Sequence, residues 1–181
     1  RVNGLSPMTW LITIARNTSI DRLRSRRATG GADMDEAAEV ADAAALLKSA
    51  KRPIIIAGGG VQYSGAVEEL TAFAEAHQIP VVETIAGRAN MLATHPLNIG
   101  PIGVTGSDSA NEIAEQADVI IAVGTRLQDF TTGSWTAFAK EAQFVSINAA
   151  RHDAGKHSSL PVVGDAKLSL NASKLSFSQL L

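Results

Sequence analysis

Short apolar runs alternate with amphipathic stretches along most of the chain. Each run is rich in small or β-branched residues, is bounded by Gly, Pro or polar residues, and has the length of a strand buried on both faces of a sheet. Apolar residues recur at helical spacing between the runs. The predicted strands lie at residues 53–57, 80–82, 119–123, 144–147 and 161–163, and the predicted helices at residues 43–50, 64–76, 107–116 and 165–175.

Strands that alternate with helices in this way predict right-handed βαβ units around a parallel sheet. We therefore expect residues 44–172 to form a doubly wound, Rossmann-like α/β domain. Ser109 and Glu112 have the spacing of a capping box at the start of one helix, and Asp165 is the predicted cap of the last helix. Residues 173–181 are expected to form a tail outside the domain.

The first 43 residues differ from the rest in charge and periodicity. Residues 1–27 hold six arginines and one acidic residue, whereas residues 33–42 hold five acidic residues and no basic one. Apolar residues from Trp10 to Leu23 recur at roughly helical spacing. This asymmetry predicts a short, basic helical segment with a nucleic-acid-facing side, joined to the domain by an acidic linker over residues 33–43.

Composition narrows the possible classes of protein. The 181 residues suit one domain with an appendage, and the net charge of −2 argues against a nucleic-acid surface over the whole chain. The chain has no cysteine, which excludes disulfides and thiolate chemistry. We see no apolar run of about 18 residues and no signal peptide, so we expect a cytoplasmic protein with no membrane span. Because the chain starts at Arg1, we expect a fragment or a processed product.

Two glycine-rich turns are candidate sites for an anionic cofactor. Gly58, Gly59 and Gly60 follow the first predicted strand, and Gly103 and Thr105 belong to a loop that precedes a predicted helix. Glycine lets backbone N–H groups approach a pyrophosphate at the start of a helix. The triplet is not the G-x-G-x-x-G fingerprint, so a dinucleotide site is weakly supported. The alternative interpretation of the triplet is a tight turn with close helix packing, and that of the second turn is a glycine loop that packs at a domain interface.

The most informative stretch runs from Gly124 to Trp135, directly after the predicted strand at 119–123. The C-terminal ends of strands form the edge where open α/β sheets bind ligands. Arg126 can bind a carboxylate or phosphate there, or it can form a turn-stabilising pair with Asp129. The sequence leaves both interpretations open.

Further polar residues add one candidate contact but no catalytic group. Asn148 ends the next predicted strand and is a candidate cofactor contact at the same edge. His152 and His157 are five residues apart, which is not a metal-binding spacing on one helical face. Glu83 ends a strand without a visible acid–base partner. We therefore predict no catalytic residue and no metal ligand.

The stretch from Gly124 to Trp135 resembles the central domain of thiamine-diphosphate (TPP) enzymes, in which a strand runs into a Gly-x-Arg-[aromatic or Leu]-x-Asp turn. Residues 82–87 (VETIAG) and 95–106 (HPLNIGPIGVTG) resemble the members of that family that act in inositol catabolism. The resemblance covers roughly residues 44–170. Some relatives hold FAD or ADP in this domain, and the present motifs resemble those with an empty cleft. Asn148 stands where FAD-binding relatives tend to carry an acidic residue.

The resemblance implies a TPP- and Mg²⁺-dependent hydrolase that cleaves a C–C bond in a cyclic 1,2-diketone. In this family TPP lies between two other domains, the pyrimidine and diphosphate domains, and the residues that activate TPP and bind the metal lie outside this segment. We therefore expect a non-catalytic central domain that binds no cofactor itself and is inactive alone. Its expected partners are the pyrimidine and diphosphate domains, in a homo-oligomeric enzyme.

Residues 7–24 resemble region 2 of bacterial extracytoplasmic-function sigma factors, whose basic helix contacts the promoter and the core polymerase. This second resemblance stops near residue 43, so the sequence resembles a chimera. Two other hypotheses therefore stay open. The chain could be a stand-alone Rossmann-like module that binds NAD, FAD or ADP, or a sigma-factor fragment that binds promoter DNA or core RNA polymerase.

Overall fold

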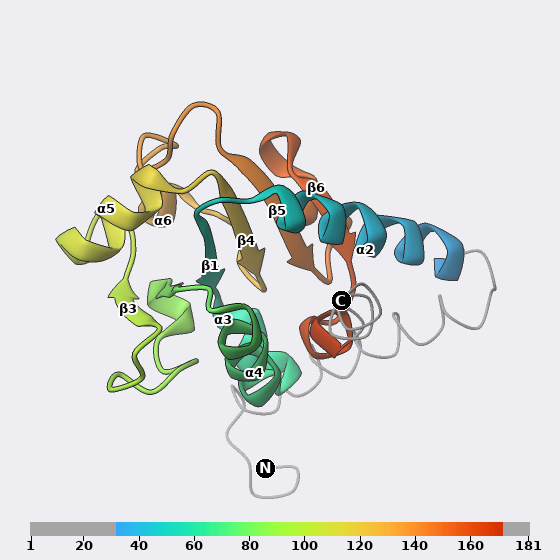
Figure 1. Cartoon of the computed structure of the whole chain (residues 1–181), viewed down its shortest axis with the longest axis horizontal. Helices are drawn as coiled ribbons and strands as arrows, with labels where there is room; N and C mark the ends of the chain where they lie inside the picture. The colour runs from blue at the N-terminus through green and yellow to red at the C-terminus, as the bar shows by residue number, and fades with distance from the viewer. Residues whose placement is uncertain (1–31, 172–181) are drawn as a thin grey trace, which may run out of the picture.

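Parallel strands form a single sheet at the centre of the protein (Figure 1). The computed structural model describes residues 32–171, so the predicted basic segment and tail lie outside the described residues. The strand order β3-β2-β1-β4-β5-β6 is that of a doubly wound fold and confirms the predicted fold class. The strands are β1 (Pro53–Ala57), β2 (Val81–Glu83), β3 (Asn98–Pro101), β4 (Val119–Val123), β5 (Gln143–Asn148) and β6 (Leu160–Val163).

β1 and β4 form the middle of the sheet because they are apolar at nearly every position. All of β4 is buried, and so are residues 54–57 of β1. Ile55 of β1 pairs with Ile121 of β4 in parallel register. A strand covered on both faces buries every side chain, which explains why neither segment shows the alternation of a half-exposed strand.

Two apolar cores lie on opposite faces of the sheet, because successive residues of a strand point to opposite sides. Ile55 and Ala57 belong to one core, and Ile54 and Ile56 to the other. Helices α2, α3, α4 and the helical residues 166–171 cover the first face, and α5 covers the second (Figure 1). The helices are α2 (Ala32–Ser49), α3 (Gly59–Ser64), α4 (Val67–His77), α5 (Asp108–Gln116), α6 (Asp129–Thr132) and α7 (Arg151–Ala154).

Helix α2 corrects the prediction of an acidic linker. The helix begins at Ala32 rather than Ala43, so the acidic residues lie on its first turns. Glu39 fastens this part to the domain: its Oε1 accepts a hydrogen bond from Arg151 Nη2 at 2.9 Å, and its Oε2 accepts one from the backbone N–H of Val163 at 3.1 Å. Alanine and glutamate both favour helix, so the change in charge that we interpreted as a boundary does not interrupt the helix.

The predicted helix at 64–76 corresponds to α4, and the short helix α3 that precedes it was not predicted. α3 ends at Ser64 and is followed by Gly65, which has a left-handed φ of 67°, and α4 starts at Val67. A left-handed residue just after the last helical turn stops the helix, and glycine adopts that conformation without a Cβ clash. The sequence analysis overlooked this signal because the apolar periodicity continues on both sides of it.

Strand β3 was not predicted. It pairs with β2 through an irregular register, in which Val81 lies opposite Asn98 and Val82 opposite Gly100. Gly100 has a φ of 109°, and β3 ends at Pro101. Glycine and proline are tolerated at an edge strand, where they conceal the strand signal in the sequence.

The helix caps were predicted with mixed success. The cap of α5 is Ser107, whose hydroxyl accepts a hydrogen bond from the N–H of Ala110, so the prediction of a capping box from Ser109 was wrong. Asp165 does cap the last helix, since its Oδ1 accepts hydrogen bonds from the N–H groups of Lys167 and Leu168. Two helix-start signals stood close together before α5, and the periodicity did not separate them.

Asp118 joins the first and fourth strands at the amino edge of the sheet. Its two carboxylate oxygens accept hydrogen bonds from the backbone N–H groups of Lys51 and Arg52, at 2.7 and 2.8 Å. Burial raises the pKa of this carboxyl, but the backbone hydrogen bonds outweigh it and hold the pKa below its usual value of 3.8. The charged form therefore stabilises the fold.

Asp118→Asn should lower the free energy of unfolding by about 1–2 kcal/mol at neutral pH, because an amide cannot accept both hydrogen bonds. Since the folded-state pKa is depressed, the wild-type advantage is complete above about pH 5 and disappears as the pH falls through the folded-state pKa. Urea unfolding of both proteins at several pH values measures it. Asp42→Asn, on the exposed face of α2, is the control, and a pH-independent difference would contradict the assignment.

Candidate functional site at the carboxyl edge of the sheet

The candidate site lies where the chain reverses its direction of winding, between β1 and β4. From β1 the chain adds β2 and β3 on one side, and β4, β5 and β6 then extend the sheet on the other. Doubly wound proteins bind nucleotides in the crevice outside the carboxyl ends of the strands at this point. Gly58, Gly59 and Gly60 follow β1, and Gly124 follows β4, so the predicted glycines do meet at the crevice.

Backbone contacts close this crevice. The N–H of Gly58 donates to the carbonyl of Val123 at 2.8 Å, and the N–H of Gly60 donates to the carbonyl of Gly124 at 2.9 Å. A Cβ on Gly58 would overlap the Gly124 carbonyl oxygen, and a Cβ on Gly60 would lie 2.6 Å from the Gly124 Cα. The glycines therefore allow one loop to pack directly on the other, which favours our alternative interpretation over a phosphate cradle.

The other predicted contacts are also engaged within the domain. The N–H of Gly124 donates to the carbonyl of Ile147 at 2.9 Å. Asn148 donates from Nδ2 to the carbonyl of Thr125, and its Oδ1 accepts from the N–H of Ala150. These two residues fasten the loop after β4 to the end of β5.

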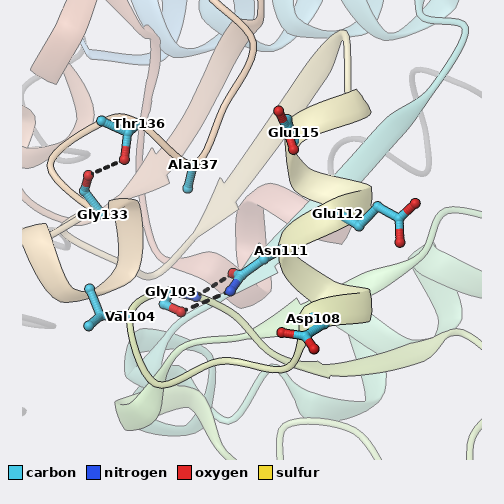
Figure 2. Close-up of a pocket in the computed structure, with 9 residues that line it drawn as sticks. All are labelled: Gly103, Val104, Asp108, Asn111, Glu112, Glu115, Gly133, Thr136 and Ala137. Carbon is cyan, nitrogen blue, oxygen red and sulfur yellow. Dashed lines mark hydrogen bonds between the residues drawn. The ribbon is translucent and has the colours of Figure 1, made fainter.

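The second glycine loop is held by a residue that the sequence analysis missed. Asn111 reaches from α5 to Gly103, donating from Nδ2 to its carbonyl at 3.0 Å and accepting from its N–H at 2.9 Å (Figure 2). Thr105 lies exposed beyond this clamp. An asparagine on the face of a helix next to a glycine loop was the signal that could have identified it. The predicted anion cradle is therefore already filled by a side-chain amide.

Arg126 is the predicted residue that remains available to a partner. Its side chain is exposed, and it forms no ion pair with any residue in the described range 32–171, so the turn-stabilising pair with Asp129 does not form. The residues on each side are anchored: Thr125 and Leu127 are buried, and the Leu127 N–H donates to Thr125 Oγ1 at 3.2 Å. A rigid loop thus holds a permanent positive charge at the carboxyl edge.

The loop from 124 to 135 concentrates left-handed backbone conformations. The φ angles are 60° at Gly124, 46° at Leu127, 55° at Gly133, 52° at Ser134 and 69° at Trp135. A left-handed conformation at a residue other than glycine costs about 1–3 kcal/mol, and it persists only when the surroundings enforce it. Such clusters occur at sites whose exact shape matters to function.

Trp135 connects this loop to the one that follows β5. Its ring stacks on His157 with 3.4 Å between ring centroids, and it packs edge-on against Phe144 at 5.4 Å. His157 also has a left-handed backbone, with a φ of 51°. His152 and His157 are both exposed, and His157 also covers the Trp135 ring.

A buried polar cluster fastens the segment after β2. Glu83 is buried and accepts a hydrogen bond from the N–H of Met91 at 3.0 Å. Thr84 accepts one from the N–H of Gly87, and Asn90 donates to the carbonyl of Gly58 at 2.8 Å. Glu83 therefore has a backbone partner that the sequence did not reveal, and this contact holds the segment after β2.

An open cavity of about 510 Å³ lies beside α5 (Figure 2). Asp108, Glu112 and Glu115 of α5 are among the residues that line it. Clustered carboxylates repel a phosphate, and no group of three or more potential metal ligands occurs within residues 32–171. Neither this cavity nor the closed crevice fits TPP. The lining residues are Gly103, Val104, Asp108, Asn111, Glu112, Glu115, Gly133, Thr136 and Ala137.

Comparison with known families decides what this domain is. The family described as "Thiamine pyrophosphate enzyme, central domain" matches residues 40–173. The chain belongs to this family. The match confirms the predicted resemblance and starts four residues before the expected boundary at residue 44.

Relatives of this TPP-enzyme domain point to one member of the family. The 3D-(3,5/4)-trihydroxycyclohexane-1,2-dione hydrolase 2 of Bacillus cereus is 48% identical over 136 residues, which cover 75% of the chain and 21% of that protein. The 3D-(3,5/4)-trihydroxycyclohexane-1,2-dione hydrolase of Bacillus subtilis (strain 168) is 49% identical over 133 residues, covering 73% and 21%. The chain thus spans about a fifth of the length of these relatives.

The same comparisons give no support to the sigma-factor resemblance of residues 7–24, and those residues lie outside the described range. Within residues 32–171, no helix has both the length and the apolar content needed to cross a bilayer.

Gly58→Ala should destabilise this TPP-enzyme domain by about 3 kcal/mol or more, because the new methyl group meets a backbone carbonyl that cannot rotate away. Gly155→Ala is the matched control: its Cβ would have its nearest neighbour at 3.5 Å, so the free energy of unfolding should change by less than about 0.5 kcal/mol. Urea unfolding measures both. Equal stability of the two variants would show that the crevice is not closed by this contact.

Proposed function

We propose that the chain is the central, non-catalytic domain of a TPP-dependent hydrolase that cleaves a C–C bond of a cyclic 1,2-diketone in inositol catabolism. The observation that carries this proposal is the 47–49% identity to relatives that are named dione hydrolases. Because the chain spans only 21% of their length, the catalytic groups belong to the remainder of the enzyme.

The geometry supports a non-catalytic role. The N–H groups of Gly58 and Gly60 at the switch point, which could have bound a pyrophosphate, donate instead to the carbonyls of Val123 and Gly124. The carboxylates beside the cavity are exposed and lie on one helix face, without an opposing acid or base. The domain therefore serves as a rigid body that spaces its neighbours and forms one wall of the substrate entrance.

TPP and Mg²⁺ bind, in this proposal, between the pyrimidine and diphosphate domains of a homo-oligomeric cytoplasmic enzyme. Neither alternative hypothesis has a specific observation in its favour. The closed crevice argues against a stand-alone NAD, FAD or ADP module. A sigma-factor fragment would require a role for residues 7–24 that no comparison supports.

The isolated chain should be inert toward TPP with Mg²⁺ and toward NAD, FAD and ADP. A ligand that binds the folded state raises its stability by RT ln(1 + [L]/Kd), so a panel at millimolar concentration would detect micromolar binding as a clear rise in melting temperature. We expect no rise with any of the four. Stabilisation by a nucleotide alone would favour the stand-alone module, and binding of TPP would overturn the non-catalytic assignment.

Arg126 is the residue that we propose to act at the substrate entrance of the full-length enzyme. It is exposed, unpaired within the described residues and held by a rigid loop, and its charge suits a carboxylate or an electron-rich oxygen of the substrate or of a neighbouring domain. Arg126→Ala should leave the melting temperature unchanged and lower turnover of the dione by about tenfold or more, which corresponds to about 1.4 kcal/mol.

The matched control for Arg126→Ala is Lys140→Ala, another exposed cation beyond the same loop. Steady-state kinetics of the full-length enzyme and its melting curve are measured for both variants. Unchanged turnover in Arg126→Ala would assign this arginine to solvation of the loop alone. Absence of dione hydrolase activity in the wild-type enzyme would refute the proposed function itself.

A further inference from the structure

Three large apolar side chains are exposed at the carboxyl edge of the sheet. Ile85 follows β2, Val104 follows β3 and Phe130 follows β4, and their exposed fractions are 61%, 67% and 64%. We call these three residues the edge surface. Single exposed apolar residues are ordinary on a protein, but several on the loops of one sheet edge are typical of an interaction site.

The backbone beneath Val104 and Phe130 is locked. The N–H of Val104 donates to the carbonyl of Phe130 at 2.9 Å, which joins the loop after β3 to α6. Gly103 packs so closely on Phe130 that a Cβ would overlap its carbonyl oxygen, and the amide of Asn111 holds Gly103 through both of its backbone polar groups. Both apolar side chains are therefore presented on a preorganised support, which lowers the entropic cost of docking.

Ile85 is held in a comparable way. It starts the short 3-10 helix Ile85–Gly87, which is capped by the hydroxyl of Thr84. Asn90, which is fully buried, ties the following turn to the carbonyl of Gly58. Buried polar contacts thus hold apolar side chains exposed to solvent. This exposure does not stabilise an isolated domain.

We propose that the edge surface docks against another domain of the same full-length enzyme. This inference rests on the proposed function, because the occupant is part of the four-fifths of the relatives' length that this chain does not span. The docking face should be apolar at its centre. Since Val104 also borders the acidic cavity with Asp108 and Glu112, the face should carry lysine or arginine on that side.

The test compares the isolated chain with the full-length enzyme. Hydrogen–deuterium exchange should be slower at residues 103–105 and 129–131 in the full-length enzyme than in the isolated chain, and unchanged around Tyr63 and Leu168. These two residues, exposed at 62% and 44%, lie on α3 and on the helical residues 166–171, which cover the first face of the sheet. Equal exchange at the edge surface in both proteins would overturn the proposal.

A double variant makes the test independent of local folding. Val104→Asp with Phe130→Asp should leave the melting temperature of the isolated chain nearly unchanged but lower that of the full-length enzyme by several degrees. Tyr63→Asp with Leu168→Asp should lower neither. An equal shift of the melting temperature in the isolated chain and in the full-length enzyme would overturn the proposal. Hydrogen exchange at the edge surface of the isolated chain that slows as its concentration rises would also overturn it, because the surface would then bind a second copy of the chain.

Failure of the docking proposal can be distinguished from failure of the proposed function. If the wild-type full-length enzyme does not hydrolyse the dione, the proposed function fails, yet the exchange comparison still shows whether the edge surface is covered. If the enzyme is active but the edge surface exchanges freely, the docking inference alone fails.

Discussion

The direct contact between the loops after β1 and β4 is the constraint on which the carboxyl edge depends. Gly58 and Gly60 allow their backbone to hydrogen-bond to Val123 and Gly124, at the point where related folds leave space for a ligand. Once the two loops are joined, the loop after β4 can be anchored further to β5 through Asn148. The crevice becomes part of the structural core. The exposed groups that can contact a partner are then Arg126 and the edge surface.

The loop that carries Arg126 and Phe130 has a strained backbone, and contacts elsewhere in the fold must offset the free-energy cost of that strain. Leu127, Ser134 and Trp135 adopt left-handed conformations that cost free energy, and buried packing of Leu127 and the ring contacts of Trp135 hold them there. A loop that did not have to hold its residues in fixed positions would relax to ordinary backbone conformations. Its retention of this shape is consistent with a surface that must match a partner, because a rigid loop loses little entropy when it docks.

The strands at the centre of the sheet could be predicted from the sequence, whereas the contacts at its edge could not. β1 and β4 are continuous apolar runs, and burial on both faces is the only environment that suits them. Gly103 and Asn148 were predicted as candidate cofactor contacts, but the contacts that hold them within the domain were not predicted. Their partners, Asn111 and Thr125, lie 8 and 23 residues away, and local patterns carry no information on such contacts.

The acidic segment shows why a change in charge is a poor guide to a domain boundary. Glu39 lies in the segment that we interpreted as a linker, yet its two carboxylate oxygens bind Arg151 and the backbone of Val163 on the edge strand β6. An edge strand presents unpaired N–H groups, and a carboxylate from a covering helix satisfies one of them while blocking pairing with another chain. Glu39 therefore belongs to the domain through its contacts with Arg151 and β6, although it lies in a segment that the charge pattern set apart.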